Sequence, residues 1–306
     1  MEGSRPFDSE LDFDHQRRNR PEPPPPLSGR EGPSRRRKPR RDRSETIARV
    51  LWAIPWLIII ITVTIVGDAL FAAAMAVFAC IGLAELYRMT AAVRPLTLVG
   101  FAAAAALCAA AYFGDQYQMV IALAAVFPVA FAVAVLRPAR EHVTLSLALT
   151  VFGIAWIAVP FAHAVLLREL PDHGAALLAD VLVATFVSDT AAYAGGRLFG
   201  RHRLAPALSP NKTLEGLAFG VVGGTLGFWF AGLYQDWLPG IDALAMGLCI
   251  ALLAPVGDLF ESMVKRDLEI KDSGTVFGPH GGMLDRIDAV LFTVVAGYYL
   301  SVLFVY

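Results

Sequence analysis

The stretch DLFESMVKRDLEIKDSGTVFGPHGGMLDRID, residues 258–288, lies between two long apolar runs and carries 11 charged residues in 31 positions. Charge kept beside hydrocarbon is energetically costly and usually serves a function. Carboxylates stand at both ends of the stretch, basic residues lie between them, and the flexible sequence GPHGG precedes the last acidic pair. We therefore start from the hypothesis of a polar site at the edge of a membrane.

Spacing within the stretch predicts shared helix faces. A helix continuing from the preceding apolar run presents on one side four residues that are three or four positions apart: Asp258, Glu261, Ser262 and Lys265. Asp285 and Asp288 are three positions apart and share a face at the start of the last apolar run. Carboxylate oxygens suit Mg²⁺, which leaves coordination positions for substrate phosphates, and Lys and Arg neutralise the remaining phosphate charge. An ordinary solvated loop is the alternative, but the ordered run of acidic, basic and His-Gly-Gly elements favours a phosphate and metal site.

A family resemblance rests on residues 262–288, which read S-M-V-K-R-x4-K-D-S-G-T-V-F-G-P-H-G-G-M-L-D-R-I-D. This pattern resembles the signature of phosphatidate cytidylyltransferases, also called CDP-diacylglycerol synthases, and shows no departure from it. The resemblance implies an integral membrane enzyme of phospholipid biosynthesis. Such an enzyme condenses CTP with phosphatidic acid to give CDP-diacylglycerol and pyrophosphate. The implied cofactor is Mg²⁺, with room for a second cation.

The composition is that of a polytopic membrane protein. Of 306 residues, 56% are hydrophobic and 17% charged, and the mean hydropathy is +0.56. Soluble domains average about 25% charged residues. The three cysteines, Cys80, Cys108 and Cys249, all fall in apolar runs without metal or disulfide spacing, so we expect small buried side chains.

The chain divides into two regions. Residues 1–46 are rich in Pro, Arg, Asp, Glu and Ser, which predicts a disordered cytoplasmic tail. Its basic cluster at 35–43 either binds anionic lipid or only helps to set the topology. Residues 47–306 are predicted to be the transmembrane catalytic domain, with the signature block at 258–288.

Nine apolar segments predict an all-α fold with about nine transmembrane helices. They cover approximately 47–66, 68–87, 96–113, 118–136, 143–167, 174–195, 214–234, 241–260 and 287–306. Most reach the roughly 20 residues that a spanning helix needs; the third and fourth are the shortest. Their high Ala and Gly content suits close helix packing in lipid.

Basic residues predict the orientation of these helices. With the N-terminus in the cytoplasm, the loops on that side carry twelve Lys and Arg residues: Arg88, Arg94, Arg137, Arg140, Arg197, Arg201, Arg203, Lys212, Lys265, Arg266, Lys271 and Arg286. The opposite loops carry only Arg168. Such an excess marks the cytoplasmic side. We therefore expect a multi-pass protein of the plasma membrane, of bacterial inner-membrane type, with its site facing the cytoplasm.

A second polar block, SDTAAYAGGRLFGRHRLAPALSPNKTLEG at 188–216, joins the sixth and seventh segments. Asp189 lies inside an apolar run, with Tyr193 one helical turn later. An intramembrane Asp is a functional candidate, although a neighbouring helix can also satisfy it. Asn211 and Lys212 follow a Ser-Pro turn. This block too resembles the family, and it lies on the same predicted membrane face as the signature.

The candidate site residues have three hypothetical roles. The metal ligands are Asp258, Asp285 and Asp288, with Asp189 close to them. The catalytic residues are Lys265, Arg266, Lys271, Asp272, His280 and Arg286. The substrate-binding residues are Ser262, Asn211, Lys212 and Tyr193. The expected partners are CTP, phosphatidic acid and membrane lipid, with no nucleic acid; a homodimer is compatible with these features.

Two other functions and two minor sites remain to be weighed. A secondary transporter would couple ions through Asp189 and Asp258, but transporters place their sites near the midplane and often contain repeats. A CTP-dependent polyprenol kinase would release CDP instead of pyrophosphate.

Glu85 and Arg88 are predicted to form an ion pair at a helix end. His163 is predicted to be a packed core residue rather than a ligand.

Overall fold

The computed structural model describes residues 55, 58–137, 142–270, 273–274 and 281–306. The chain separates into residues 1–43 and residues 44–306, and the described residues all belong to the second unit. The predictions for the N-terminal tail and for Lys271, Asp272 and His280 therefore lie outside the described residues.

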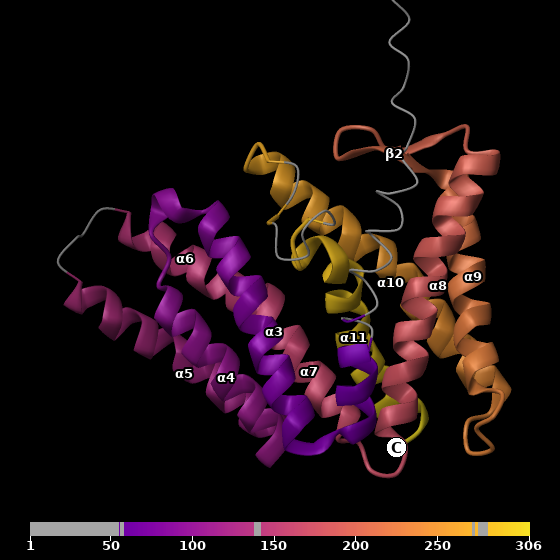
Figure 1. Ribbon diagram of the computed structural model, residues 1–306, viewed down its shortest axis with the longest axis horizontal. Helices are drawn as coiled ribbons and strands as arrows, with labels where there is room; N and C mark the ends of the chain where they lie inside the picture. Colours follow the sequence, from indigo (N-terminus) through magenta and orange to yellow (C-terminus); the bar gives the residue numbers. More distant parts are fainter. Residues whose placement is uncertain (1–54, 56–57, 138–141, 271–272, 275–280) are drawn as a thin grey trace, which may run out of the picture. The chain divides into compact units, whose positions relative to one another are not determined.

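Helices make up nearly all of the described part of this unit (Figure 1). Residues 58–66 are helical. They are followed by α3 (Asp68–Met89), the short η1 (Ala91–Val93), α4 (Thr97–Phe113), α5 (Gln116–Leu136), α6 (Val143–Gly153), the π-helical turn η2 (Ile154–Ala158), α7 (Val159–Arg168), α8 (Gly174–Phe199), α9 (Leu214–Gly232), α10 (Gly240–Asp267) and α11 (Leu284–Phe304). Two short strands, β1 (Arg203–Ala205) and β2 (Ser209–Thr213), pair antiparallel between α8 and α9.

Seven helices of the described residues are long and apolar enough to cross a membrane. They are α3, α5, the continuous helix formed by α6, η2 and α7, and α8 to α11. The predicted helical, polytopic fold is thus confirmed. Two of the nine predicted spans are not among the seven: α4 is shorter, and the first is described only in part. The hairpin of β1 and β2 was not predicted.

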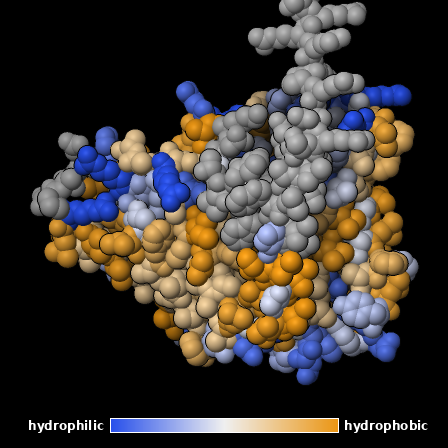
Figure 2. Space-filling model, in the orientation of Figure 1, coloured by the Kyte–Doolittle hydropathy of each residue, from blue (hydrophilic) through white to orange (hydrophobic). Residues whose placement is uncertain are grey.

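Successive helices alternate in direction, so that the ends of α8 and α10 and the starts of α9 and α11 meet near the hairpin (Figure 1). We call this side of the unit the hairpin end. Arg168 lies at the opposite end, where its Nε donates to the carbonyl of Thr64 at 2.9 Å. Figure 2 shows an apolar band across the visible face, with hydrophilic residues at the two ends. This is the distribution that a membrane-spanning unit requires.

Small residues allow the helices around the site to pack closely. α8 packs along α9, and α10 packs on both α9 and α11. Gly220 and Gly224 of α9 lie against Ser188 of α8, where a side chain would collide. In lipid, such close backbone approach replaces the hydrophobic effect as the source of helix association. The packing brings the polar ends of α8, α10 and α11 together.

Candidate active site

A lysine from the hairpin meets a carboxylate near the end of α10. Lys212 Nζ lies 2.5 Å from Asp258 Oδ2, and the two side chains are 23% and 36% exposed. Asp189 of α8 lies near enough for its charge to interact with both groups. A lysine and carboxylates from two helices therefore lie near one another at the boundary with water.

Asp288 of α11 adds a further carboxylate to this group. Its charge interacts with those of Asp258, Glu261 and Asp189. Gly257 permits the approach of α10, because a side chain at this position would collide with the backbone of Asp288. We call Asp189, Lys212, Asp258 and Asp288 the acidic cluster. Its carboxylates repel one another, so the cluster favours a bound cation.

A second cluster is built around Lys265 of α10. Its Nζ donates to Glu261 Oε2 at 2.9 Å and to Asp285 Oδ1 at 2.8 Å. Asp285 Oδ2 accepts from the backbone N–H and the hydroxyl of Ser273, each at 3.0 Å, and from the N–H of Gly282 at 2.8 Å. Charge-assisted hydrogen bonds of this kind are strong. Lys265 therefore ties α10 to the start of α11, and Asp285 ties that start to Ser273 and Gly282 of the signature block.

The predicted polar face of α10 is confirmed. Ser262 Oγ donates to Asp258 Oδ1 at 3.5 Å, and Lys265 bonds Glu261 one turn earlier. Both pairs have the i, i+4 spacing that brings side chains together on a helix. Glu261 is predicted on this face from its spacing, without a role of its own. In the structure Glu261 is 2% exposed and belongs to the site.

The predicted ion pair between Glu85 and Arg88 is wrong. Glu85 of α3 is 1% exposed, and its carboxylate accepts the N–H groups of Met283 and Leu284 at 2.8 and 3.0 Å. It also accepts the hydroxyl of Ser273 at 3.2 Å. These are N–H groups that a helix start leaves without partners, and a negative charge there is favourable. Glu85 therefore caps α11 from a distant part of the chain.

Glu85 could have been singled out by one signal in the sequence. It lies in the run FACIGLAELYRM, residues 78–89, inside an apolar segment. A carboxylate in such a segment is costly unless it has a specific partner. The sequence thus indicates that Glu85 has a partner, but it does not indicate which one.

The start of α9 holds the hairpin in place. Glu215 accepts the backbone N–H of His202 at 3.2 Å and lies 2.6 Å from the Nδ1 of the same residue. Thr213 caps α9, because its hydroxyl accepts the N–H of Gly216 at 3.1 Å. These contacts hold the start of β1 and the end of β2, the strand that carries Lys212, against the start of α9. Lys212 is therefore positioned by backbone contacts and not by its ion pair alone.

Two predicted substrate-binding residues form no hydrogen bond or ion pair with the acidic cluster among the described residues. The hydroxyl of Tyr193 accepts a hydrogen bond from Arg197 at 3.2 Å, and Tyr193 is 65% exposed. Asn211 is exposed on β2. It precedes Lys212, and neighbouring side chains of a strand point to opposite faces. Of the residues predicted in this block, Asp189 and Lys212 are the ones that the structure brings to the site.

The predicted basic residues of the signature block lie in different places. Lys265 is at the centre of the second cluster. Arg266 is exposed and donates to the carbonyls of Leu208 and Ile270 at 3.4 and 3.5 Å, so it links α10 to the hairpin. Arg286 is exposed in the first turn of α11. Lys271, Asp272 and His280 lie outside the described residues.

His163 is a core residue, as predicted. It is 3% exposed, and its ring nitrogens lie 2.8 Å from the carbonyl of Val159 and 3.3 Å from the hydroxyl of Tyr299. Both nitrogens therefore have partners within the helix packing.

Three of the four predicted metal ligands, Asp189, Asp258 and Asp288, lie in the acidic cluster, whereas Asp285 is bonded to Lys265. Within the part of the chain that the structure describes, no three His, Cys, Asp or Glu side chains are arranged to hold a metal ion. Glu261 Oε1 is nevertheless buried without a hydrogen-bond partner among the described residues, and Glu261 lies near Asp288 of the acidic cluster. These oxygen donors are the ligands that Mg²⁺ takes. The residues thus fit a divalent cation in donor type and charge, although their side chains would have to turn to bind it.

Comparison with known proteins identifies the family to which the chain belongs. The model of the cytidylyltransferase family matches residues 47–304. A phosphatidate cytidylyltransferase of Mycobacterium leprae is 39% identical over 150 residues, which are 49% of this chain and 47% of the relative. One from Thermotoga maritima is 38% identical over 153 residues (48% and 57%), and one from Helicobacter pylori is 44% identical over 121 residues (40% and 45%). The chain spans about half the length of the curated relatives it matches.

Proposed function

The chain belongs to the cytidylyltransferase family, and from this premise we propose that it transfers the cytidylyl group of CTP to phosphatidic acid. The products are CDP-diacylglycerol and pyrophosphate. The observation that carries the proposal is the placing of Lys212 and Lys265 among carboxylates at one end of membrane-spanning helices. A water-soluble triphosphate and a membrane lipid can meet at such a boundary.

The reaction needs positioning and charge neutralisation more than acid–base chemistry. An oxygen of the lipid phosphate attacks the α-phosphorus of CTP and forms a new P–O bond. The bond to the β-phosphate breaks, and its bridging oxygen leaves with pyrophosphate. A phosphate monoester is already largely ionised near neutral pH, so no strong base is required. Groups fixed in advance around the reacting phosphates supply most of the catalysis in such reactions.

Each described lysine of the site has a distinct role in this proposal. Lys212 lies at the water boundary with Asp258 and would neutralise a phosphate of CTP. Lys265 is 14% exposed and bonded to two carboxylates. It holds α10 and α11 at a fixed distance and keeps a positive charge next to the reacting phosphates. Arg266 and Arg286 are exposed and lie where they would attract the triphosphate.

We place the cation in the acidic cluster, with Asp189, Asp258 and Asp288 as its ligands. A bound Mg²⁺ would neutralise phosphate charge and polarise the P–O bonds. Glu261 would supply a further oxygen from the same side of α10. Asp285 is engaged by Lys265, Ser273 and Gly282, and would reach the cation only by giving up one of these contacts.

The proposed topology rests on the nine apolar segments and on the excess of Lys and Arg on one side of them. We propose nine spans, with the hairpin end in the cytoplasm of a bacterial cell, where CTP is available. A reporter fused after Tyr306 should then be extracytoplasmic, and one inserted between residues 205 and 209 should be cytoplasmic. If the two reporters are found on the same side, the proposed number of spans is wrong.

One assay tests the proposed reaction and separates it from its rivals. The purified protein in detergent receives phosphatidic acid, Mg²⁺ and CTP labelled on either the α- or the γ-phosphate. Cytidylyl transfer moves only the α-label into the lipid extract, whereas a lipid kinase with a polyprenol acceptor moves only the γ-label. A transporter moves neither label into lipid. Absence of α-label from the lipid, with well-folded protein, would contradict the proposal.

A further inference from the structure

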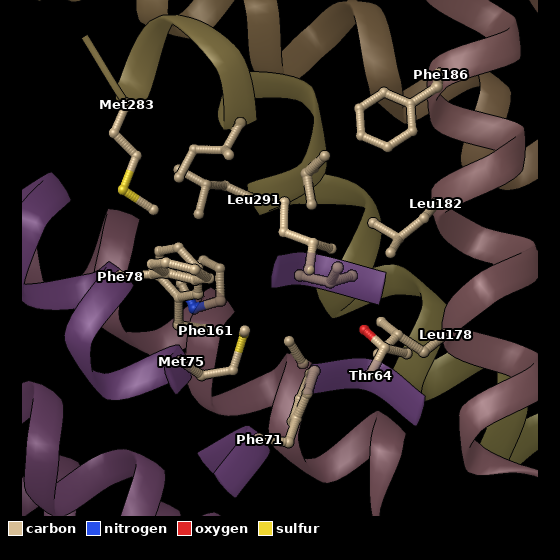
Figure 3. Close-up of a pocket in the computed structure, with 16 residues that line it drawn as sticks. Thr64, Phe71, Met75, Phe78, Phe161, Leu178, Leu182, Phe186, Met283 and Leu291 are labelled. Atoms are coloured by element: carbon tan, nitrogen blue, oxygen red, sulfur yellow. The ribbon is translucent and has the colours of Figure 1, made fainter. Parts of the chain in front are cut away.

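An apolar cavity of about 110 Å³ lies among the helices next to the site. Its walls come from α3, α7, α8, α11 and the helical residues 58–66 (Figure 3). Apart from the hydroxyl-bearing Thr64, every residue that lines it is apolar. Ile60 and Phe186, which are 37% and 50% exposed, belong to its lining. The cavity is therefore a recess that hydrocarbon can enter from the surface of the helices.

The cavity continues the acidic cluster along two helices. On α8 its wall is formed by Leu178, Leu182 and Phe186, spaced by four, and Asp189 follows Phe186 by three. All four residues thus share one face of α8. On α11 the cavity residue Ile287 directly precedes Asp288.

The depth of the cavity follows from the same helix. Along the helix axis Phe186 is about 4.5 Å from Asp189, slightly less than one turn, and Leu178 is about 16 Å from it. A molecule whose phosphate is at Asp189 could therefore extend an apolar tail past Phe186 toward Leu178. Ala164 of α7 and Phe71 of α3 line the cavity as well. Both lie near the helix ends away from the hairpin, so they mark its deep end.

We propose that this cavity binds part of one acyl chain of the lipid substrate. The inference rests on the proposed function, because that function places a phospholipid phosphate at the acidic cluster. A dry cavity of roughly 150 Å³ accepts benzene, so the present cavity takes a segment of chain and not all of it. An acyl chain gains little by leaving lipid for an equally apolar wall. The cavity therefore acts by fixing the position of the lipid, and so of its phosphate.

The test fills the deep end and varies the length of the acyl chains. Ala164 is 5% exposed and lines the cavity; Ala164→Leu adds bulk there. The matched control is Ala155→Leu, on the same continuous helix, where the alanine is exposed and lines no part of the cavity. Turnover is measured in detergent with dipalmitoyl and dihexanoyl phosphatidic acid, since the short chains do not reach the deep end.

The readout is the ratio of kcat/KM for the long substrate to that for the short one. We expect Ala164→Leu to lower this ratio about tenfold, which is the low end of the discrimination that a hydrophobic pocket makes between substrates differing by one methylene. Ala155→Leu should leave the ratio unchanged. An unchanged ratio in Ala164→Leu overturns the inference, whether both activities persist or fall together; a structural lipid in the cavity would give that result. If wild-type protein converts neither substrate, the proposed function fails instead.

Discussion

The two halves of the described chain contribute to the site in different ways. Residues 174–306 carry the acidic cluster and Lys265, and their motifs can be recognised in the sequence. Residues 58–168 carry no such motif, yet Glu85 from this half caps α11 and bonds Ser273 inside the signature block. The groups proposed to do chemistry therefore lie close together in the sequence. Glu85, which helps to hold them in place, comes from a distant part of the chain.

We expect the largest loss of activity when a carboxylate of the acidic cluster, in the C-terminal half, is replaced. Asp258→Asn removes one negative charge from the proposed cation site and nearly keeps the shape of the side chain. The same change takes away the charged partner of Lys212. Losing one oriented charged group in a preorganised site typically costs about 10²–10³ in rate. We expect a loss of this size in kcat for CDP-diacylglycerol formation, with unchanged membrane insertion, and partial recovery at high Mg²⁺.

The matched control for this variant is Asp267→Asn. Asp267 is exposed at the end of the same helix and should keep most activity. Near-normal kcat for Asp258→Asn at limiting Mg²⁺ would show that the acidic cluster is only a feature of the helix ends. The chemistry would then have to be sought elsewhere in the signature block.

The next effect concerns the contribution of the N-terminal half. Glu85→Ala leaves the N–H groups of Met283 and Leu284 unpaired, which should cost about 1–3 kcal/mol in the free energy of unfolding. It also frees Ser273, which positions Asp285, so kcat should fall about 10- to 100-fold through loss of positioning. Glu85→Gln keeps one carbonyl acceptor and should therefore lose less stability and less kcat than Glu85→Ala. Thermal unfolding in detergent and turnover below the transition measure the two effects.

Arg88→Gln is the control for Glu85, because Arg88 lies on the same helix and is exposed. Arg88→Gln should change neither the free energy of unfolding nor kcat. If Glu85→Ala is less stable but keeps full kcat while folded, then the N-terminal half only supports the fold. In that case only residues 174–306 would contribute to the chemistry of the site.

Local patterns account for what the sequence predicted well. The long apolar runs predicted most spans, and the i, i+4 spacing predicted the polar face of α10. The partnership of Glu85 with Met283 could not be predicted in this way, because 198 positions separate the two residues. Nor could the hairpin, since β1 and β2 are short and their pairing depends on contacts with α9.

The predicted grouping of Asp285 with Asp288 shows a second limit of local patterns. Residues three apart on a helix differ by about 60° in direction. This difference is enough for Asp285 to bond Lys265 while Asp288 interacts with Asp258. A shared face therefore indicates proximity, but the neighbouring helices decide which partner each side chain takes.

A smaller effect is expected at the edge of the site. Lys212→Gln keeps a polar side chain on β2 but removes its charge. Since the Lys212–Asp258 pair is partly exposed, solvent and salt screen its contribution. We expect about a tenfold rise in KM for CTP, a modest change in kcat and a weaker dependence on ionic strength. Arg203→Gln, at an exposed position of β1, is the control; an equal effect there would mean that general surface charge is responsible.

The smallest effect on activity is predicted for a buried polar contact of the N-terminal half that lies away from the site. Thr150 is fully buried, and its hydroxyl accepts the N–H of Leu96 at 2.8 Å. Thr150→Val keeps the shape but leaves that N–H without a partner, at a cost of about 1–3 kcal/mol in the free energy of unfolding. Thr144→Val, exposed on the same helix, should cost nothing measurable. Both variants should keep the kcat of the wild type while folded, because no hydrogen bond joins either residue to Glu85 or to the described part of the signature block. A fall in kcat for Thr150→Val that matches Glu85→Ala would mean that the whole N-terminal half, and not Glu85 in particular, sets the geometry of the site.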